Sequence, residues 1–372
     1  MKFLIIAPRF HTNLYYRAKA LQDAGHNVRI ITLYRGKSEF YDEFKPMVLK
    51  LSKFSNLLLK TVSFFKKGKL KSSFEMRFQT PNKEFEKIIR VYEPDAILLK
   101  AYQNALAIKT LRTAKKYKAK VLMLTQTPFT HIKGSKFLFK LNIKLFKFLK
   151  VHAYITPIKS NYIAFKNFGI KNVFYLPFVY PSTIKKIKKT DDTIKILSVG
   201  KFQKRKEQLL LTEIFTKLIN EGYNIKLCLI GEVVNTKYIK TLHYFIKKNK
   251  LSEKICIETN VPYSQMTGLY KKYDLFVLPA YNEPAAYSPV EALANGLPVI
   301  CSDQNGTKCY IEEGENGYIF KAKNEDDLYE KIKLCISNKE KLNKMKENAL
   351  LSAKENHNLF DFEQNILKII KN

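Results

Sequence analysis

The chain has 372 residues, 46% of them hydrophobic, and carries 66 Lys and Arg against 33 Asp and Glu, a formal net charge of +33. This length and apolar content exclude a disordered chain and predict a globular protein of two domains. Residues 1–190 hold 39 Lys and Arg against 9 acids, whereas residues 191–372 hold 27 against 24, so the charge indicates an anionic partner for the first half.

Short apolar runs alternate with amphipathic stretches along the whole chain. The first half contains predicted strands at residues 3–7, 28–33, 96–99, 121–125 and 153–156. The second half contains them at residues 194–199, 225–230, 255–257, 275–278 and 298–301. Continuous apolar runs between helical segments are typical of buried parallel strands in βαβ units, which predicts the α/β fold class. The polar, Lys-rich residues 181–192 separate the halves.

Two basic amphipathic segments stand out in the first half. Residues 47–67 are predicted to form a helix with large apolar side chains on one face (Met47, Leu51, Phe54, Leu58, Val62, Phe65) and lysines opposite (Lys45, Lys53, Lys60, Lys67). Residues 136–150 repeat this pattern. Such faces suit a helix lying on anionic lipid, where each lysine adds roughly 1 kcal/mol of attraction. The alternative is that both apolar faces pack into the domain core.

Other partners and compartments are less well supported by the sequence. No helix-turn-helix, zinc spacing or aromatic sheet motif is visible, so no nucleic-acid partner is expected. The first ten residues are too short for a signal peptide, and no apolar run reaches the roughly 18 residues of a spanning helix. We therefore expect a cytoplasmic protein, peripheral on the inner face of the membrane. The five cysteines (Cys228, Cys256, Cys301, Cys309, Cys335) form no Cys-x-x-Cys, which predicts free thiols and no metal site.

Residues 273–300 are the most informative segment. They predict a strand, an irregular loop with Glu283, a helix that opens at Ser288 and Pro289 and contains Glu291, and a second strand. Ligands bind at the carboxyl ends of strands in open α/β sheets, and free N–H groups at a helix start attract anions. Carboxylates beside these N–H groups can bind hydroxyl groups. Together the two features favour a ligand in which a phosphate is joined to a sugar. The alternative for Ser288 and Glu291 is a structural capping box; Glu283 has no such role.

This segment resembles the donor-site motif of family 4 glycosyltransferases, retaining enzymes of the GT-B fold. The resemblance is carried by the Glu-x7-Glu pair Glu283 and Glu291, by the small residues 292–294 and by the Gly-Leu-Pro-Val turn at 296–299. Residues 198–211 resemble the phosphate-binding turn of that family, with Gly200, Lys201 and Lys206 at its positions, and residues 227–232 resemble its next strand and turn. The similarity covers most of residues 190–320.

The resemblance implies two Rossmann-like, doubly wound domains that face a cleft. Residues 1–185 would form the acceptor and membrane-facing domain, residues 190–355 the donor domain, and residues 356–372 a C-terminal helix that packs back on the first domain. The implied reaction is retaining transfer of a hexosyl group from a nucleotide-sugar to a lipid-linked or polysaccharide glycan acceptor, as in capsule or lipopolysaccharide assembly. An inactive GT-B binding subunit, or a nucleic-acid-binding protein, is the alternative.

The resemblance also assigns roles to residues. Glu283 would contact the transferred sugar, and Lys206 and Lys201 would supply positive charge where the diphosphate leaves. Glu291 would bind the ribose hydroxyls. Gly200, Ser288, Tyr287 and Ala286 would complete the donor site. The reaction needs no cofactor beyond the nucleotide-sugar substrate, and no metal is implied because no Asp-x-Asp occurs.

The chain departs from the family pattern at several positions. Lys201 replaces an arginine, which exchanges a two-pronged donor for a point charge. Residues 284–286 read Pro-Ala-Ala where the family often has Gly-Phe-Gly, and residues 8–16 lack the usual glycines. Gln126 takes the position of a family histidine. We expect five residues on the acceptor side, namely Arg9, His11, Asn13, Gln126 and His131.

Overall fold

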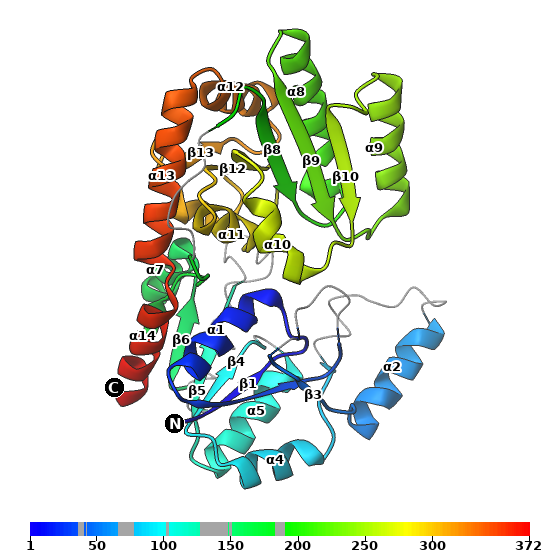
Figure 1. Ribbon diagram of the computed structural model, residues 1–372. Coiled ribbons are helices and arrows are strands. Elements are labelled where there is room, and N and C mark those ends of the chain that lie inside the picture. The colour runs from blue at the N-terminus through cyan, green and yellow to red at the C-terminus, as the bar shows by residue number, and fades with distance from the viewer. Residues whose placement is uncertain are drawn as a thin grey trace. The chain divides into compact units, whose positions relative to one another are not determined.

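A computed structural model describes residues 1–35, 41, 43–65, 78–101, 104–126, 148, 151–182 and 190–372, with side chains from residue 62 to 65 left out of the description. The chain divides into two compact units (Figure 1). Unit 1 comprises Met1–Leu176 and Leu359–Asn372, and unit 2 comprises Pro177–Asn358. Each unit is built around its own parallel sheet.

Unit 1 contains a seven-stranded parallel sheet in the order β3-β2-β1-β4-β5-β6-β7. Its strands are β1 (Lys2–Ile6), β2 (Asn27–Thr32), β3 (Met47–Val48), β4 (Ala96–Leu99), β5 (Lys120–Leu124), β6 (Ala153–Thr156) and β7 (Val173–Tyr175). Its described helices are α1 (Thr12–Asp23), α2 (Lys53–Phe65), α4 (Glu84–Tyr92), α5 (Ala105–Lys116), α7 (Lys159–Asn167) and α14 (Leu359–Lys371). From β1 the chain adds strands first on one side (β2, β3) and then on the other (β4 to β7). The switch point between β1 and β4 is where such sheets place ligands.

The C-terminal helix α14 packs against α1 within unit 1. It buries Phe362 and Ile366, and the Arg17 guanidinium lies 5.6 Å from the centre of the Phe362 ring. The His26 ring nitrogen Nε2 lies 2.9 Å from Oε1 of Glu363, which adds a polar contact beside this apolar seam. The contact of α14 with α1 confirms the predicted return of the C-terminal helix to the first unit.

Unit 2 contains a six-stranded parallel sheet in the order β10-β9-β8-β11-β12-β13. Its strands are β8 (Ile194–Val199), β9 (Ile225–Gly231), β10 (Ile255–Thr259), β11 (Leu275–Leu278), β12 (Val299–Ser302) and β13 (Gly317–Phe320). Its helices are α8 (Gln208–Asn220), α9 (Thr236–Lys248), α10 (Tyr263–Tyr270), α11 (Ser288–Ala294), α12 (Glu325–Ile336) and α13 (Lys339–Asn356), with 3₁₀ turns η2 (Lys204–Lys206) and η3 (Gly306–Tyr310). Loops after β8, β9 and β11 meet at one edge.

All ten predicted strands are present within two residues of their predicted bounds. The fold class is therefore confirmed as two parallel, Rossmann-like sheets. The strands β3, β7 and β13, which have two, three and four residues, were not predicted from the sequence. Each lies at the edge of its sheet, where one neighbouring strand suffices and the continuous apolar run of a central strand is not required.

The predicted helix over residues 47–67 is wrong at its start. Met47 and Val48 form β3, which pairs with β2, and the helix α2 begins only at Lys53. The Ser52 hydroxyl accepts a hydrogen bond from the backbone N–H of Ser55 at 3.1 Å, the arrangement of a helix N-cap. Residues 136–150, the second amphipathic segment, lie outside the described residues apart from Phe148.

The prediction of five free thiols is wrong for two cysteines. Cys228 and Cys256 form a disulfide, whereas Cys301, Cys309 and Cys335 are free. Cys228 and Cys256 are directly opposite each other on the neighbouring strands β9 and β10, with Cα atoms 4.7 Å apart. Their separation of 28 residues in sequence carries no sign of this pairing, because only the sheet register brings the two side chains together.

Candidate functional site

The turn after β8 begins the candidate site in unit 2. Gly200 and Lys201 leave the strand, and the side-chain amide of Gln208 donates hydrogen bonds to their carbonyl oxygens at 3.2 and 3.1 Å. The 3₁₀ turn η2 follows and ends at Lys206. Lys206 is only 7% exposed although it is a lysine, so the turn directs its side chain inward.

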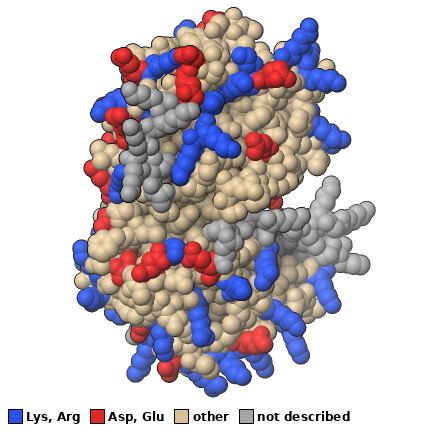
Figure 2. Space-filling model, in the orientation of Figure 1, with Lys and Arg blue, Asp and Glu red and all other residues tan. Residues whose placement is uncertain are grey.

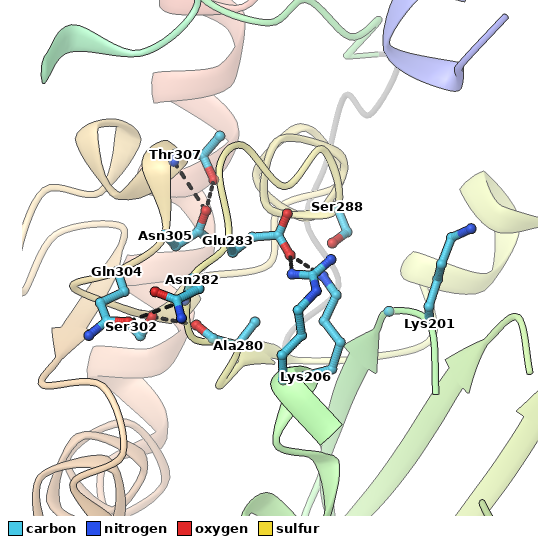
Figure 3. A network of polar contacts seen from close by, with 12 residues as sticks. Lys201, Lys206, Ala280, Asn282, Glu283, Ser288, Ser302, Gln304, Asn305 and Thr307 are labelled. Atoms are coloured by element: carbon cyan, nitrogen blue, oxygen red, sulfur yellow. Dashed lines mark hydrogen bonds and ion pairs between the residues drawn. The ribbon is translucent and has the colours of Figure 1, made fainter. Parts of the chain in front are cut away.

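A buried ionic cluster joins this turn to the loop after β11. The Lys206 ammonium lies 2.6 Å from Oε2 of Glu283, and the Arg205 guanidinium nitrogen Nη1 lies 2.5 Å from the same oxygen. Figure 3 shows the Lys206 side chain pointing at the Glu283 carboxylate. Glu283 is 7% exposed, which makes this pairing a desolvated one. Two of the predicted site residues are thus in direct contact, together with an arginine that sequence analysis had not named.

The two cations of this cluster hold the Glu283 carboxylate ionised, whereas burial lowers the pKa of Lys206 despite the opposing effect of Glu283. Burial by itself would raise the pKa of Glu283, but the Lys206 and Arg205 charges and hydrogen bonds outweigh it and hold that pKa below the usual carboxyl value. Lys206 has three N–H donors and Arg205 has five, and both contact one carboxylate oxygen. Each cation therefore has donors left for a second anion. The cluster is suited to binding a phosphate beside a carboxylate.

The loop that carries Glu283 is anchored by backbone hydrogen bonds. The Glu283 carbonyl accepts from the N–H of Gly306 at 2.9 Å, and the Glu283 N–H donates to the carbonyl of Gln304 at 3.2 Å. The N–H of Tyr281 donates to the carbonyl of Arg205 at 3.0 Å, which ties the loop to η2. The Pro-Ala-Ala sequence that follows therefore does not prevent Glu283 from occupying a fixed position.

Glu291 lies in a separate polar pocket formed by two tyrosines. The hydroxyls of Tyr263 and Tyr270 donate to its two carboxylate oxygens at 2.5 and 2.9 Å, and Glu291 is 5% exposed. Burial raises the pKa of Glu291, and the two hydroxyls partly oppose that shift. The Ser288 hydroxyl donates to the carbonyl of Val199 at 3.2 Å, and α11 has no side-chain cap. The capping-box alternative for Ser288 and Glu291 is thus wrong.

The remaining predicted donor residues line the same edge of the sheet in unit 2. The Tyr287 hydroxyl donates to the carbonyl of Val179 at 2.5 Å, and Ala286 is buried. The ammonium of Lys201 pairs with Glu232 at 2.8 Å, so it does not join the cluster around Glu283 (Figure 3). Lys201 contacts the loop after β9, and its charge is partly matched there.

The residues predicted for the acceptor side belong to unit 1. The side-chain amide of Asn13 donates to Gln126 at 3.2 Å and its carbonyl oxygen accepts from Lys100 at 2.7 Å. Arg9 and His11 contact each other, with the guanidinium nitrogen 3.1 Å from the ring nitrogen Nδ1. His131 lies outside the described residues. The structure thus groups Asn13 and Gln126 around a lysine that the sequence did not single out.

Some residues of the site could be found only partly from sequence. Tyr263 and Tyr270 are seven residues apart on α10, a spacing that places both on one helical face. This spacing could have indicated that the two tyrosines act together. Arg205 adjoins Lys206, but nothing in the sequence distinguishes it from the many other basic residues. Lys100 follows β4, at the carboxyl edge of the sheet in unit 1.

Gly231 is a structural glycine that sequence analysis did not list. A Cβ atom at Gly231 would lie 2.0 Å from the carbonyl oxygen of Gly200, whereas a Cβ at Gly200 would meet only ordinary contacts from 3.5 Å. The close approach of these two turns therefore requires glycine at position 231.

We expect Gly231→Ala to destabilise unit 2 by roughly 1–3 kcal/mol or more, because backbone atoms have to move. It should also weaken binding of ligands at the turn after β8. Gly200→Ala is the matched control for folding, since it adds the same methyl group without a clash. Thermal unfolding of both variants measures the difference, and equal melting temperatures would contradict the steric explanation.

The sequence of this chain is similar to that of known proteins. Residues 180–351 match the sequence model of the family described as Glycosyl transferases group 1. Spore coat protein SA of Bacillus subtilis is 29% identical over 183 residues, which cover 47% of this chain and 48% of that protein. The capsular polysaccharide biosynthesis glycosyltransferase CapM of Staphylococcus aureus is 26% identical over 147 residues, 40% of this chain and 38% of CapM. The chain thus spans less than half the length of these curated relatives.

A solved structure extends the similarity in fold to the whole chain. Anabaena Alr3699/HepE, determined in complex with UDP, superposes with a TM-score of 0.73 at 15% identity, and the match covers 100% of both chains. Identity at that level supports the fold alone. The family match to residues 180–351 and the two parallel sheets agree with each other. Residues 180–351 are therefore similar to the group 1, or family 4, glycosyltransferases, and the chain has the GT-B fold.

Proposed function

We propose that this protein transfers a hexosyl group, with retention of anomeric configuration, from a nucleotide-sugar donor to a glycan acceptor. The contact of Lys206 and Arg205 with Glu283 is the observation that carries the proposal. It joins buried positive charge to a carboxylate at the carboxyl edge of a parallel sheet. A diphosphate and a sugar hydroxyl require those two kinds of partner side by side.

Each group then has a chemical task. Negative charge grows on the diphosphate as the bond to the sugar breaks, and preorganised cations in a desolvated site stabilise that charge. Lys206 and Arg205 supply the positive charge, while Glu283 orients these two side chains and binds a hydroxyl of the transferred sugar. Glu291, held by two tyrosine hydroxyls, keeps lone pairs free for the ribose hydroxyls of the nucleotide. Lys201 would add charge at the edge of the same turn.

The donor can be identified by binding. Thermal-shift measurements with UDP, GDP, CDP and ADP should reveal one nucleoside diphosphate that stabilises the protein, by roughly 2.7 kcal/mol at 100 times its dissociation constant. Lys206→Ala should abolish that shift. Transfer from the matching nucleotide-sugars, followed by NMR of the anomeric proton of the product, would then test retention. A well-folded sample that no nucleotide stabilises would instead favour an inactive binding subunit.

The acceptor is proposed to be a lipid-linked or polysaccharide glycan presented by unit 1 at the inner face of the cell membrane. The charge balance of residues 1–190 and the name of the relative CapM, a capsular polysaccharide biosynthesis glycosyltransferase, support this choice. Lys and Arg side chains are spread over the face of unit 1 drawn in Figure 2. No described helix has the length and apolar character needed to cross a bilayer.

Helix α2 is the part of unit 1 proposed to lie on the lipid. Phe54 is 67% and Leu57 62% exposed, and Lys53 and Lys60 on the same helix are exposed beside them. Large exposed apolar side chains next to lysines suit an anionic bilayer surface. Co-flotation with vesicles that contain phosphatidylglycerol should be lost in Phe54→Ser/Leu57→Ser. It should persist in Tyr244→Ser/Leu351→Ser, which removes comparably exposed apolar groups from unit 2.

A further inference from the structure

A hollow in unit 2 lies at the opposite end of the strands from the candidate donor site. It has a volume of about 620 Å³ and includes residues at the amino ends of β8, β9 and β10, together with Lys271, Lys272 and Tyr273 after α10. Gly200 and Glu283, in contrast, follow the carboxyl ends of β8 and β11. The volume is within the usual range for small-molecule sites, about 300–1,000 Å³.

The hollow exists because one sheet face is incompletely covered. Tyr270 of α10 packs against Phe276, which shares its sheet face with Leu197 and Cys228 through the strand register. The eight residues of α10 extend about 12 Å, whereas the seven residues of β9 extend about 23 Å. The helix therefore leaves the amino ends of the strands open, although parallel sheets usually bury both faces. The Cys228–Cys256 disulfide lies on this open face and lines the hollow.

Lysines form a row across this open face. Lys195 of β8 is directly opposite Lys226 of β9, and Lys254 immediately precedes the residue of β10 that pairs with Leu227. Neighbouring strands are about 4.8 Å apart, so the row places like charges side by side, which is destabilising without a counter-ion. With Lys271 and Lys272, five lysines and one acid, Glu253, line the hollow. The second half of the chain as a whole is nearly balanced, with 27 basic and 24 acidic residues, so these lysines are a local excess.

Most of this charge is unmatched by the part of the chain that the structure describes. Lys195 has a weak ion pair with Asp191 at 3.8 Å. Lys226, Lys254, Lys271 and Lys272 make no ion pair with any described residue. Cys228, Cys256 and Glu258 lie within 4.8 Å of one another, but the two sulfurs are joined to each other and the surrounding lysines repel cations. The hollow therefore favours an anion over a metal ion.

We propose that the hollow at the amino ends of β8, β9 and β10 is a second binding site, for a ligand that carries phosphate groups. Its volume exceeds that of a single phosphate, and the half-buried Tyr273 adds an aromatic surface for the rest of the molecule. The ligand is either a soluble phosphorylated compound or the phosphate headgroup of a lipid. The site is separate from the donor site, so its existence does not depend on the proposed transfer reaction.

The test compares two double variants that change the net charge equally. Lys226→Glu/Lys254→Glu reverses two charges of the hollow, and Lys247→Glu/Lys248→Glu reverses two exposed charges at the end of α9. Binding of inorganic tripolyphosphate is measured by calorimetry, and retention by vesicles is measured with and without phosphatidylglycerol. Both variants keep the donor site, so the difference between them reports the hollow.

We expect the hollow variant to lose roughly tenfold or more in affinity for tripolyphosphate while the α9 variant changes little. Loss of vesicle retention alone in the hollow variant would instead identify a lipid headgroup as the ligand. Equal behaviour of the two variants in both assays would overturn the proposal and leave the lysines as a solvated face.

Thermal unfolding provides a second comparison of the hollow variant with the α9 variant. Without ligand and at low salt, Lys226→Glu/Lys254→Glu should raise the midpoint of thermal unfolding, because position 226 then carries a charge opposite to that of Lys195, while positions 226 and 254 remain like-charged as before. The α9 variant should show no such rise. The milder pair Lys226→Gln/Lys254→Gln, matched by Lys247→Gln/Lys248→Gln, repeats the binding test should a charge reversal prevent folding.

Discussion

Lys206→Ala is expected to lower the turnover of sugar transfer by roughly 100- to 1,000-fold, the usual cost of losing one preorganised group that stabilises charge in a transition state. Lys206 is buried and lies 2.6 Å from Glu283, so its loss also leaves a desolvated carboxylate with Arg205 as its remaining ion-pair partner among the described residues. Removing one partner of a buried ion pair usually costs about 3–5 kcal/mol, and Arg205 should reduce that cost. Steady-state kinetics and thermal unfolding measure the two effects separately.

Lys204→Ala is the matched control for this variant. Lys204 belongs to the same 3₁₀ turn and carries the same charge, but its side chain is exposed. It should therefore retain nearly full activity. A folded Lys206→Ala protein that transfers sugar as fast as the Lys204→Ala protein would show that the buried ammonium has no part in the reaction.

Glu291→Gln is expected to weaken binding of the donor nucleotide by roughly 10- to 100-fold. Hydrogen bonds to charged groups contribute about 1.5–3 kcal/mol each, and the amide has only one acceptor atom where the carboxylate has two. The fold should tolerate the change, since glutamine has nearly the same shape and can still accept from one of the tyrosine hydroxyls. Calorimetry with the nucleoside diphosphate identified above gives the affinity. An unchanged dissociation constant would place the ribose elsewhere.

The pH dependence of nucleotide binding offers an independent check on Glu291. Burial raises its pKa, and the Tyr263 and Tyr270 hydroxyls oppose the shift. An acid with a raised pKa in the folded state stays protonated to higher pH, so nucleotide affinity should fall as the pH drops through that pKa. The stability contributed by this proton is present below the ordinary carboxyl pKa and is lost as the pH rises through the raised one. Tyr270→Phe removes one opposing hydroxyl and should move the loss of affinity to higher pH.

The strands show how far the sequence could predict the fold. Central strands such as β4 and β11 are continuous apolar runs buried on both faces, so the sequence pattern indicates their positions. The edge strands β3, β7 and β13 lack that pattern because only one neighbour holds each of them. The start of α2 depended on Ser52, whose capping contact with Ser55 outweighed an amphipathic pattern that began earlier.

The residues of the candidate site also divide into those that the sequence predicted and those that it did not. The pair Glu283 and Glu291, with Gly200 and Lys206, was predicted because those residues lie in loops directly after apolar strands. Their partners were not predicted. Arg205 is one basic residue among 66, and only the fold of the loop after β11 brings Glu283 to it. Lys201, predicted with Lys206 to supply positive charge, pairs with Glu232 of a neighbouring loop, a contact that the sequence does not indicate.

The sequence by itself determined the α/β class, the positions of ten strands and the Glu-x7-Glu motif of the candidate site, because burial periodicity and motif spacing are local properties of the chain. Contacts between residues distant in sequence were decided only by the tertiary structure. The Cys228–Cys256 disulfide, the lysine row at the amino ends of β8 and β9, and the need for glycine at position 231 all depend on strand register or on the approach of two turns. Register is set by packing between strands, and local sequence does not specify it alone.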